Sequence, residues 1–337
     1  MSRTLDFIVF GVARSGTGAL VRALNLHPSV FCGAGLFHYQ ADHTQIFFPE
    51  SFSDTSGSTD QQHLQKIEKT KDKLEGKGDS LAIGHKNPQY YLILEKINNQ
   101  ISNLNNVWIY RSPYGFIQSW NRRESNHKRG NWPAGRVGLY GLIELLCCVQ
   151  STIKLQRDVF LFPYEDGLNT SAEPCLKALA FLGADPALFD METFEARLLL
   201  KKRSDGHRWP LAPHEEELLD VLKINELDQI VGHYCGVMSS SLKADLSDYL
   251  ESLADRLPKA LDQAFEAYED PAVQAHGAEY FWHKRAELRG VMDLARGSKV
   301  IAEFQQYGLY DRMRTLWAQR WALKRRLTSF RLPEVAS

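Results

Sequence analysis

The sequence GVARSGTG, which begins at Gly11, combines glycines, a cation and hydroxyl groups in a pattern suited to binding an anion. It follows the apolar run 7–10, which is typical of a buried strand, and it precedes a helical pattern. A strand, a glycine loop and a helix start direct backbone N–H groups and the positive end of the helix at one spot, where phosphate or sulfate can bind. Gly11 and Gly16 have the P-loop spacing, but Thr17 stands where the Walker lysine belongs. The cation is Arg14 instead, which disfavours phosphoryl transfer from ATP.

A second segment with a cation and a hydroxyl group follows the apolar run 107–110. It reads RSPYGFIQS, from Arg111 to Ser119. Pro113 can open a helix, so the guanidinium of Arg111 is expected at the carboxyl end of a strand and Ser119 about two turns along the helix. The planar fork of an arginine binds oxyanions through two hydrogen bonds. We therefore predict a second phosphate site.

Both segments resemble motifs of the sulfotransferases that use 3′-phosphoadenylyl sulfate (PAPS), with the closest motif match to the tyrosylprotein and heparan-sulfate branches. The resemblance implies an α/β P-loop-like fold, PAPS as the donor, 3′,5′-adenosine bisphosphate (PAP) as the product, and no required metal. It implies that Arg14 holds the bridging and sulfuryl oxygens, and that Arg111 and Ser119 clamp the 3′-phosphate. The hydroxyl of Thr17 would bind the 5′-phosphate. The loop residues implied to bind the donor are Arg14, Ser15, Gly16, Thr17 and Gly18.

Three further segments extend the resemblance to about residues 5–236. IGHKNPQYY is similar to the family pattern K-x-P-x-Y/F, which implies that Lys86 neutralises charge on the transferring sulfuryl group. FPYEDGL is similar to the strand end Y-E-D-L. LLKKRSDGHRW is similar to the basic loop that closes over the nucleotide, so Lys202 and Arg203 are further candidates for donor binding.

The catalytic base of those branches has no counterpart here, because the family glutamate falls at Gly35 or Leu36. An acceptor hydroxyl must lose its proton to a carboxylate or an imidazole within hydrogen-bond reach. A neutral imidazole, with a pKa of about 6.5, can accept it. We predict His38 as the base and His85, next to Lys86, as the second candidate. The alternatives are a structural role for either histidine, a different acceptor chemistry, or nucleotide binding without turnover.

Strand-like and helical patterns alternate along the first two thirds of the chain. The strand-like runs lie at 7–10, 30–32, 81–83, 107–110 and 159–162. The helical patterns lie at about 17–26, 89–100, 114–124, 136–155 and 172–182. This alternation predicts an α/β fold in which a parallel β-sheet is flanked by helices on both faces.

Changes in composition predict two domains. Residues 1–238 form the α/β domain, with a polar insertion at about 51–79 that we expect to be a surface excursion or a lid. Residues 239–337 have helical periodicity and no strand pattern, which predicts an α-helical C-terminal region. Its basic stretch 312–331 would bind an anionic partner, mediate self-association, or expose its charges to solvent.

Composition limits the classes of function. The chain has 337 residues, of which 44 % are hydrophobic and 24 % charged, as in globular proteins. Its formal net charge of −1 gives no overall electrostatic reason to expect nucleic acid as a partner. The five cysteines never form a CxxC pattern, so neither a disulfide framework nor a zinc site is predicted. No apolar run suits a membrane span or a signal peptide, so we expect a cytoplasmic protein.

Three classes of function compete. The leading interpretation is transfer of a sulfuryl group, by in-line displacement, from PAPS to a hydroxyl of a glycan, a small metabolite or a tyrosine. The second is a kinase-like enzyme on a degenerate P-loop. The third is a non-catalytic nucleotide-binding or scaffold protein.

Overall fold

Of the chain, the computed structural model describes residues 4–34, 77, 82–124, 138–199, 211 and 213–253. The chain divides into two compact units, Met1–Arg285 and Ala286–Ser337, and all the described residues belong to the first. The predicted insertion at about 51–79 lies outside the described residues, apart from Lys77. The basic stretch 312–331 also lies outside them.

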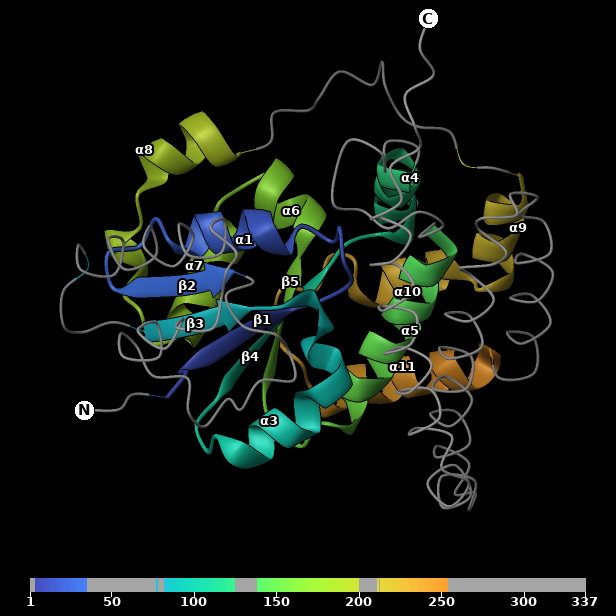
Figure 1. Ribbon diagram of the computed structural model, residues 1–337, viewed down its shortest axis with the longest axis horizontal. Coiled ribbons are helices and arrows are strands. Elements are labelled where there is room, and N and C mark those ends of the chain that lie inside the picture. The colour runs from blue at the N-terminus through green and yellow to red at the C-terminus, as the bar shows by residue number, and fades with distance from the viewer. Residues whose placement is uncertain are drawn as a thin grey trace, which may run out of the picture. The chain divides into compact units, whose positions relative to one another are not determined.

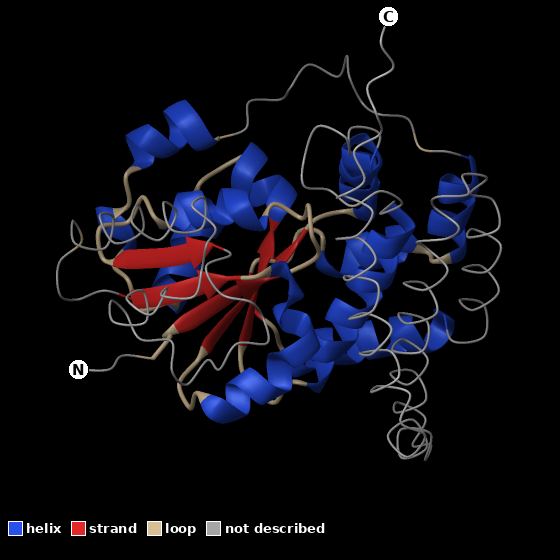
Figure 2. Ribbon diagram, in the orientation of Figure 1, coloured by secondary structure: helices blue, strands red, loops and turns tan. Residues whose placement is uncertain are grey.

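A six-stranded sheet with the order β2-β3-β1-β4-β5-β6 forms the centre of the described structure (Figures 1 and 2). Its strands are β1 (Phe7–Phe10), β2 (Val30–Ala34), β3 (Ala82–Lys86), β4 (Asn105–Tyr110), β5 (Val159–Pro163) and β6 (Gly236–Val237). The first five strands in this order pair in parallel, and β6 pairs antiparallel with β5. The prediction of an α/β fold with a mainly parallel sheet flanked by helices is confirmed.

The parallel strands end at one edge of the sheet, where the predicted site residues follow them. β1 and β5 are buried over their whole length, as their apolar sequences FIVF and VFLFP require. The register pairs Val9 of β1 with Lys86 of β3 and with Val107 of β4. The carboxyl ends of these three strands are therefore neighbours, and residues far apart in the sequence can meet beyond them.

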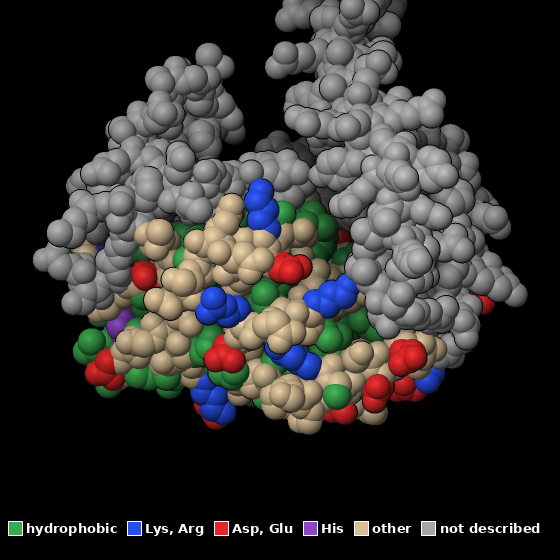
Figure 3. Space-filling view, turned by 90° about the horizontal axis from the view of Figure 1, so that it is seen from below, with side chains coloured by type: hydrophobic (Ala, Val, Ile, Leu, Met, Phe, Trp, Pro, Cys, Tyr) green, Lys and Arg blue, Asp and Glu red, His purple; other side chains and the backbone are tan. Residues whose placement is uncertain are grey.

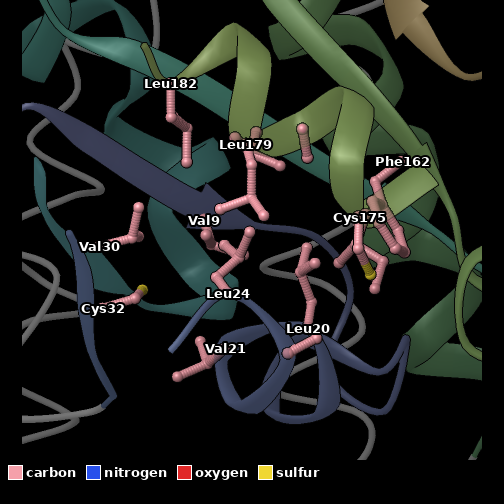
Figure 4. Close-up of a cluster of buried hydrophobic side chains, with 14 of the residues drawn as sticks. Val9, Leu20, Val21, Leu24, Val30, Cys32, Phe162, Cys175, Leu179 and Leu182 are labelled. Atoms are coloured by element: carbon pink, nitrogen blue, oxygen red, sulfur yellow. The ribbon is translucent and has the colours of Figure 1, made fainter. Parts of the chain in front are cut away.

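One face of the sheet is covered by two helices, α1 (Thr17–Leu24) and α7 (Glu173–Phe181). Leu20 and Leu24 lie one turn apart on α1 and pack with Val9 of β1 and Leu179 of α7 in one buried cluster (Figure 4). This packing fixes the axis of α1. It also fixes the direction in which the loop before α1 presents its backbone amides.

The opposite face is covered by a second group of helices (Figure 1). They are the 3₁₀-helix η2 (Pro88–Ile93), α3 (Leu94–Gln100), α4 (Pro113–Glu124), α5 (Gly138–Lys154) and α11 (Ser240–Leu253). Ile8, Phe10 and Trp108 alternate with the residues of the first cluster and are fully buried. None of the described helices is both long enough and apolar enough to cross a membrane, and this includes α5, the longest of them.

The remaining described elements are short. They are α6 (Tyr164–Asn169), the turn η4 (Pro186–Leu188), α8 (Met191–Thr193), the π-helical turn η5 (Phe194–Leu198), α9 (Pro213–Val221) and α10 (Ile224–Val231). α11 belongs to the predicted C-terminal region 239–337 and packs against α5 and α10 of the predicted α/β domain. The domain boundary at residue 238 stays a prediction. On the face shown in Figure 3, Lys and Arg side chains lie among Asp and Glu side chains.

One predicted helix is divided in two. The pattern at about 89–100 forms η2 followed by α3. The side chain of Asn87 accepts a hydrogen bond from the amide of Gln89, and Pro88 occupies the first helical position, so the first turn is well capped. Ile93, with φ −129°, then departs from helical geometry. The apolar spacing alone could not show this interruption.

Candidate functional site

The predicted anion-binding segments follow β1 and β4, which are neighbours in the sheet. From β1 the chain passes through α1 to β2 on one side, whereas β4 leads to β5 on the other side. The direction of the connections therefore changes between these strands. In open α/β sheets, ligands bind beyond the carboxyl ends of the strands at such a point.

The loop after β1 depends on glycine at its last position. Gly16 is the N-cap of α1 with φ 95°, in the left-handed region. Its carbonyl oxygen accepts hydrogen bonds from the amides of Ala19 and Leu20, which starts the helix. A Cβ added at Gly16 would lie 2.2 Å from Cδ2 of Tyr164. Only glycine therefore allows this turn and the close approach of the tyrosine ring.

Three other loop residues differ in accessibility. Ser15 is buried and its Oγ has no hydrogen-bond partner among the described residues, while a Cβ added at Gly11 would lie 3.0 Å from that oxygen. Thr17 is buried in the first turn of α1. A Cβ added at Gly18 would meet no atom of the described residues within 4 Å, so within that part of the chain the space beside the first turn of the helix is open.

Arg14 joins the two predicted segments. It adopts φ 74°, which is uncommon for a residue with a side chain. Its Nε donates a hydrogen bond of 2.9 Å to Oγ of Ser119 on α4. Desolvation lowers the pKa of the Arg14 guanidinium, and the nearby charges of Arg123 and Arg111 lower it further. The guanidinium of Arg14 is therefore close enough to two other cations for their charges to act on it, and an anion bound beside it would offset that repulsion.

Arg111 lies directly after β4 and contacts the glycine loop. Its Nη1 donates a hydrogen bond of 3.0 Å to the carbonyl oxygen of Arg14. Its guanidinium carbon lies 4.6 Å from the ring centroid of Tyr164, a cation–π contact. Gly115 leaves room for this arrangement, because a Cβ there would lie 2.9 Å from Nε of Arg111. That Nε is buried and has no partner in the described structure, so the site contains a donor without an acceptor.

The segment after β5 supplies one aromatic ring and one carboxylate to the site. The ring of Tyr164 lies beside both Gly16 and Arg111. Burial raises the pKa of the Glu165 carboxyl, while its own backbone amide, the charge of Arg111 and the amide of Ser112 act in the opposite direction. Both residues belong to the segment FPYEDGL, which was matched to a strand end. Nothing in the residue pattern predicted that the Tyr164 ring would lie beside both Gly16 and Arg111.

Trp120 was not predicted as a site residue, although it adjoins Ser119. Its indole Nε1 donates a hydrogen bond of 2.7 Å to the carbonyl oxygen of Ala13, and the side chain is fully buried. Together with the bond between Ser119 and Arg14, this contact connects α4 to two successive residues of the loop. The only sequence feature that could have indicated a role for Trp120 is its position directly after Ser119, a candidate phosphate-binding residue.

The predicted residues of β3 lie at the same edge of the sheet. Lys86 is the last residue of β3, and its charge lowers the pKa of the Cys32 thiol, although burial raises that pKa overall. His85 is fully buried, and its Nδ1 shares a hydrogen bond with the hydroxyl of Tyr90. In this position the imidazole connects β3 to η2. A role for His85 in proton transfer stays a prediction.

The structure thus brings Arg14, Arg111 and Ser119 into one hydrogen-bonded network. His38, Lys202 and Arg203 lie outside the described residues, so their predicted roles stay predictions. Within the described parts of the chain, no group of three or more His, Cys, Asp or Glu side chains is placed to hold a metal ion.

Comparison with known proteins found few similarities. No family model matches the chain, and no curated protein matches it. Among solved structures, it is similar to a sulfotransferase from Alicyclobacillus acidocaldarius, at 15 % identity over 72 % of this chain and 100 % of that chain, with a TM-score of 0.41. It is also similar to a sulfotransferase domain from the curacin biosynthetic pathway, at 14 % identity over 77 % of this chain and 99 % of that chain, with a TM-score of 0.39. Function must therefore be inferred from the residues of the site.

The guanidinium groups of Arg14 and Arg111 lie close to the N-terminus of α1, an arrangement that suits a ligand with more than one negative charge. An arginine side chain offers N–H donors in a planar fork that fits phosphate and sulfate groups. Among the described residues, Nε of Arg111 has no partner and the space beside Gly18 is open, and these two positions indicate where such a ligand would fit. The arrangement can bind phosphate groups and stabilise negative charge that develops on one of them.

Proposed function

We propose that this protein is a PAPS-dependent sulfotransferase that moves a sulfuryl group to a hydroxyl group of an acceptor. The observation that carries the proposal is the contact between the two predicted anion-binding segments. Arg14 donates to Ser119, and Arg111 donates to the backbone of Arg14. This proximity supports the binding of a single ligand with two phosphate groups by both segments.

The residues present suit such a donor. The amides of Gly16, Thr17 and Gly18, with the hydroxyl of Thr17, would bind the 5′-phosphate, as in other loops that precede a helix. Arg111 and Ser119 would bind the 3′-phosphate, and the buried Nε of Arg111 supports this role because it finds no acceptor among the residues that the structure describes. PAPS, when bound, supplies a sulfuryl group activated by its phosphate leaving group.

The chain's own contribution to the reaction is charge and position. Arg14 and Lys86 would stabilise the negative charge that develops on the leaving side, without any need for rearrangement at the moment of reaction. The acceptor oxygen forms its bond to sulfur as the bond from sulfur to the phosphate oxygen breaks. The acceptor's proton passes to a base, for which His38 is our first candidate and His85 our second.

Calorimetric titration with PAP, with and without Mg²⁺, tests the proposal. We expect PAP to bind without Mg²⁺ and far more tightly than adenosine 5′-phosphate, which lacks the second phosphate. Binding of ATP that requires Mg²⁺, together with weak binding of PAP, would favour the kinase-like alternative. Tight binding of PAP without turnover of PAPS with phenols, alcohols or sugars would favour a non-catalytic nucleotide-binding protein.

A further inference from the structure

The two residues that flank Arg111 are bonded to the same carboxylate. The hydroxyl of Tyr110 donates to Oδ1 of Asp228 at 2.5 Å, and the hydroxyl of Ser112 donates to Oδ2 at 2.8 Å. Asp228 lies on α10, more than a hundred residues away in the sequence. Each oxygen of one carboxylate thus accepts a bond from one neighbour of Arg111.

The contacts of the three residues show why these bonds matter for Arg111. Tyr110 is the last residue of β4, and both it and Ser112 contact Asp228 on α10. The guanidinium of Arg111 reaches instead the carbonyl oxygen of Arg14 and the ring of Tyr164. When Asp228 holds both neighbours on the side of α10, it thereby directs Arg111 toward the glycine loop.

The bond from Tyr110 to Asp228 begins at a buried residue, whereas Ser112 and Asp228 are half-buried. Tyr110 is almost completely buried, and its pKa is raised well above the ordinary value by burial, by the charge of Asp228 and by the hydrogen bond to it. Hydrogen bonds to a carboxylate are shorter and stronger than those between neutral groups. A buried hydroxyl that loses its acceptor must find another or remain unsatisfied. Removal of the carboxylate would therefore release both neighbours of Arg111.

A second carboxylate, that of Glu215 on α9, binds α4 near its C-terminal end. Nδ2 of Asn121 donates to Oε1 of Glu215 on α9 at 2.6 Å, and its Oδ1 accepts from the amide of Gly138 at 2.9 Å. Ser119 lies on α4, between Arg111 and Asn121 in the sequence. The consecutive helices α9 and α10, which we call the α9–α10 pair, therefore contact α4 at both ends through carboxylates.

We propose that Asp228 is a positioning residue that orients Arg111 for the second phosphate of the ligand, although it does not touch the ligand itself. This inference rests on the proposed function, because it assigns Arg111 to the 3′-phosphate of PAPS. It predicts a specific defect. Loss of Asp228 should reduce recognition of the 3′-phosphate and should leave binding of the 5′ end unchanged.

The closing experiment compares Asp228→Ala and Asp228→Asn with Glu226→Gln, a change of an exposed carboxylate on the same helix that pairs with Lys223. For each variant, calorimetry gives the ratio of the dissociation constants for adenosine 5′-phosphate and PAP. We expect Asp228→Ala to lower this ratio about tenfold, as for one misaligned charged hydrogen bond. Asp228→Asn keeps one acceptor oxygen, so its ratio should lie between those of Asp228→Ala and the wild-type protein. Glu226→Gln should have the same ratio as the wild-type protein.

A second measurement needs no ligand. The NMR signal of the Arg111 Nε–H group, identified by its loss in Arg111→Lys, should shift or broaden in Asp228→Ala and not in Glu226→Gln. If Asp228→Ala does not fold, Ser112→Ala provides the same two readouts, since it removes one of the two bonds. An unchanged ratio together with an unchanged signal would overturn the inference. If the wild-type protein does not bind PAP more tightly than adenosine 5′-phosphate, the proposed function fails. The NMR signal of Arg111 alone then decides whether Asp228 positions Arg111.

Discussion

Nη1 of Arg111 donates a hydrogen bond of 3.0 Å to the carbonyl oxygen of Arg14. The cation that follows β4 is thus attached to the backbone of the loop that follows β1. The same guanidinium lies over the ring of Tyr164, while its Nε remains without a partner. Among the described residues, Arg111 is therefore held by two contacts and keeps a buried donor, Nε, without an acceptor, an arrangement that favours tight binding of an additional anion.

Arg111→Ala should weaken binding of PAP much more than binding of adenosine 5′-phosphate. We expect a loss of about 10-fold to 100-fold for PAP, because a charge-assisted contact to a phosphate is removed. Adenosine 5′-phosphate should lose less than about 2-fold, since it lacks the group that Arg111 would contact. Titration calorimetry measures both. Arg22→Ala, at an exposed position on α1, is the control, and equal losses for both nucleotides in Arg111→Ala would contradict the clamp.

Gly16→Ala and Gly18→Ala should have opposite effects on folding. At Gly16, φ is 95° and an added Cβ would lie 2.2 Å from Tyr164, so alanine should destabilise the protein by more than about 2 kcal/mol. At Gly18 an added Cβ meets no atom within 4 Å, so alanine should be neutral or stabilise by up to about 1 kcal/mol. Thermal unfolding distinguishes them. If Gly18→Ala keeps its stability but loses affinity for PAP, the open space beside Gly18 belongs to the ligand site.

The sequence predicted the parallel strands well, and it also located the two segments that the structure brings into contact, since both depend on local signals. Apolar runs such as Phe7–Phe10 mark buried strands directly, and the order of glycine and arginine marks the loop. The order of the strands in the sheet was not predicted, because the alternation of strands and helices indicates parallel pairing without determining which strands are neighbours. The buried strands and the glycine loop can be predicted from a single sequence because each depends on residues that are close together in the chain.

The contacts that hold the site were not predictable in the same way. Asp228 and Trp120 carry no motif, and their partners are about a hundred residues away. β6 has only two residues, too short for any pattern, and it forms because it pairs with β5. Such contacts arise only when the tertiary structure places distant segments side by side, and a pattern of residue types does not record them.

Lys77→Met should destabilise the fold although Lys77 lies far from the site in sequence. Its Nζ donates to the carbonyl oxygens of Asn25, His27 and Val30, at 3.0, 2.5 and 2.7 Å, where α1 ends and β2 begins. These carbonyls would lose a charged donor, so we expect a loss of about 1.5–3 kcal/mol. Urea unfolding measures it. Lys177→Met, at an exposed pair with Glu173, should leave the free energy of unfolding nearly unchanged.

His233 should make stability depend on pH through its pair with Asp166. The hydrogen bond and the charge of Asp166 raise the pKa of His233, and Nδ1 lies 3.0 Å from the carboxylate. Because the folded-state pKa is raised, the contribution to stability is present below the unfolded value of about 6.5 and is lost as the pH rises through the folded-state pKa. His233→Ala should therefore lower the free energy of unfolding by about 0.2–1 kcal/mol at low pH only.

Urea unfolding of wild type, His233→Ala, Asp166→Asn and the double variant, at about pH 5.5 and 8.5, checks this prediction. The coupling energy between the two positions should be measurable at the lower pH and absent at the higher one. A coupling that is the same at both pH values would mean that the pair does not depend on the charge of the imidazole.

Arg14→Ala and Lys86→Ala should affect turnover more than binding. Both cations are assigned to negative charge that develops during transfer, so each change should lower kcat about 10²-fold to 10³-fold, as for the loss of one preorganised donor. The affinity for PAP should change less than about 10-fold, because the other donors of the loop remain. Arg14 has a further connection, since its side chain holds Ser119 and its carbonyl oxygen holds Arg111.

That connection separates the two variants. Arg14→Ala removes the bond to Ser119 and should therefore also lower the preference for PAP over adenosine 5′-phosphate, whereas Lys86→Ala should leave this preference unchanged. Rates with PAPS and a panel of phenols, alcohols and sugars, combined with calorimetry of both nucleotides, give the two quantities. Lys96→Ala, at an exposed position on α3, is the control for a general effect of charge. If either variant lost affinity for PAP as strongly as it lost turnover, the residue would serve binding of the donor, and stabilisation of the transfer step would have to come from other groups.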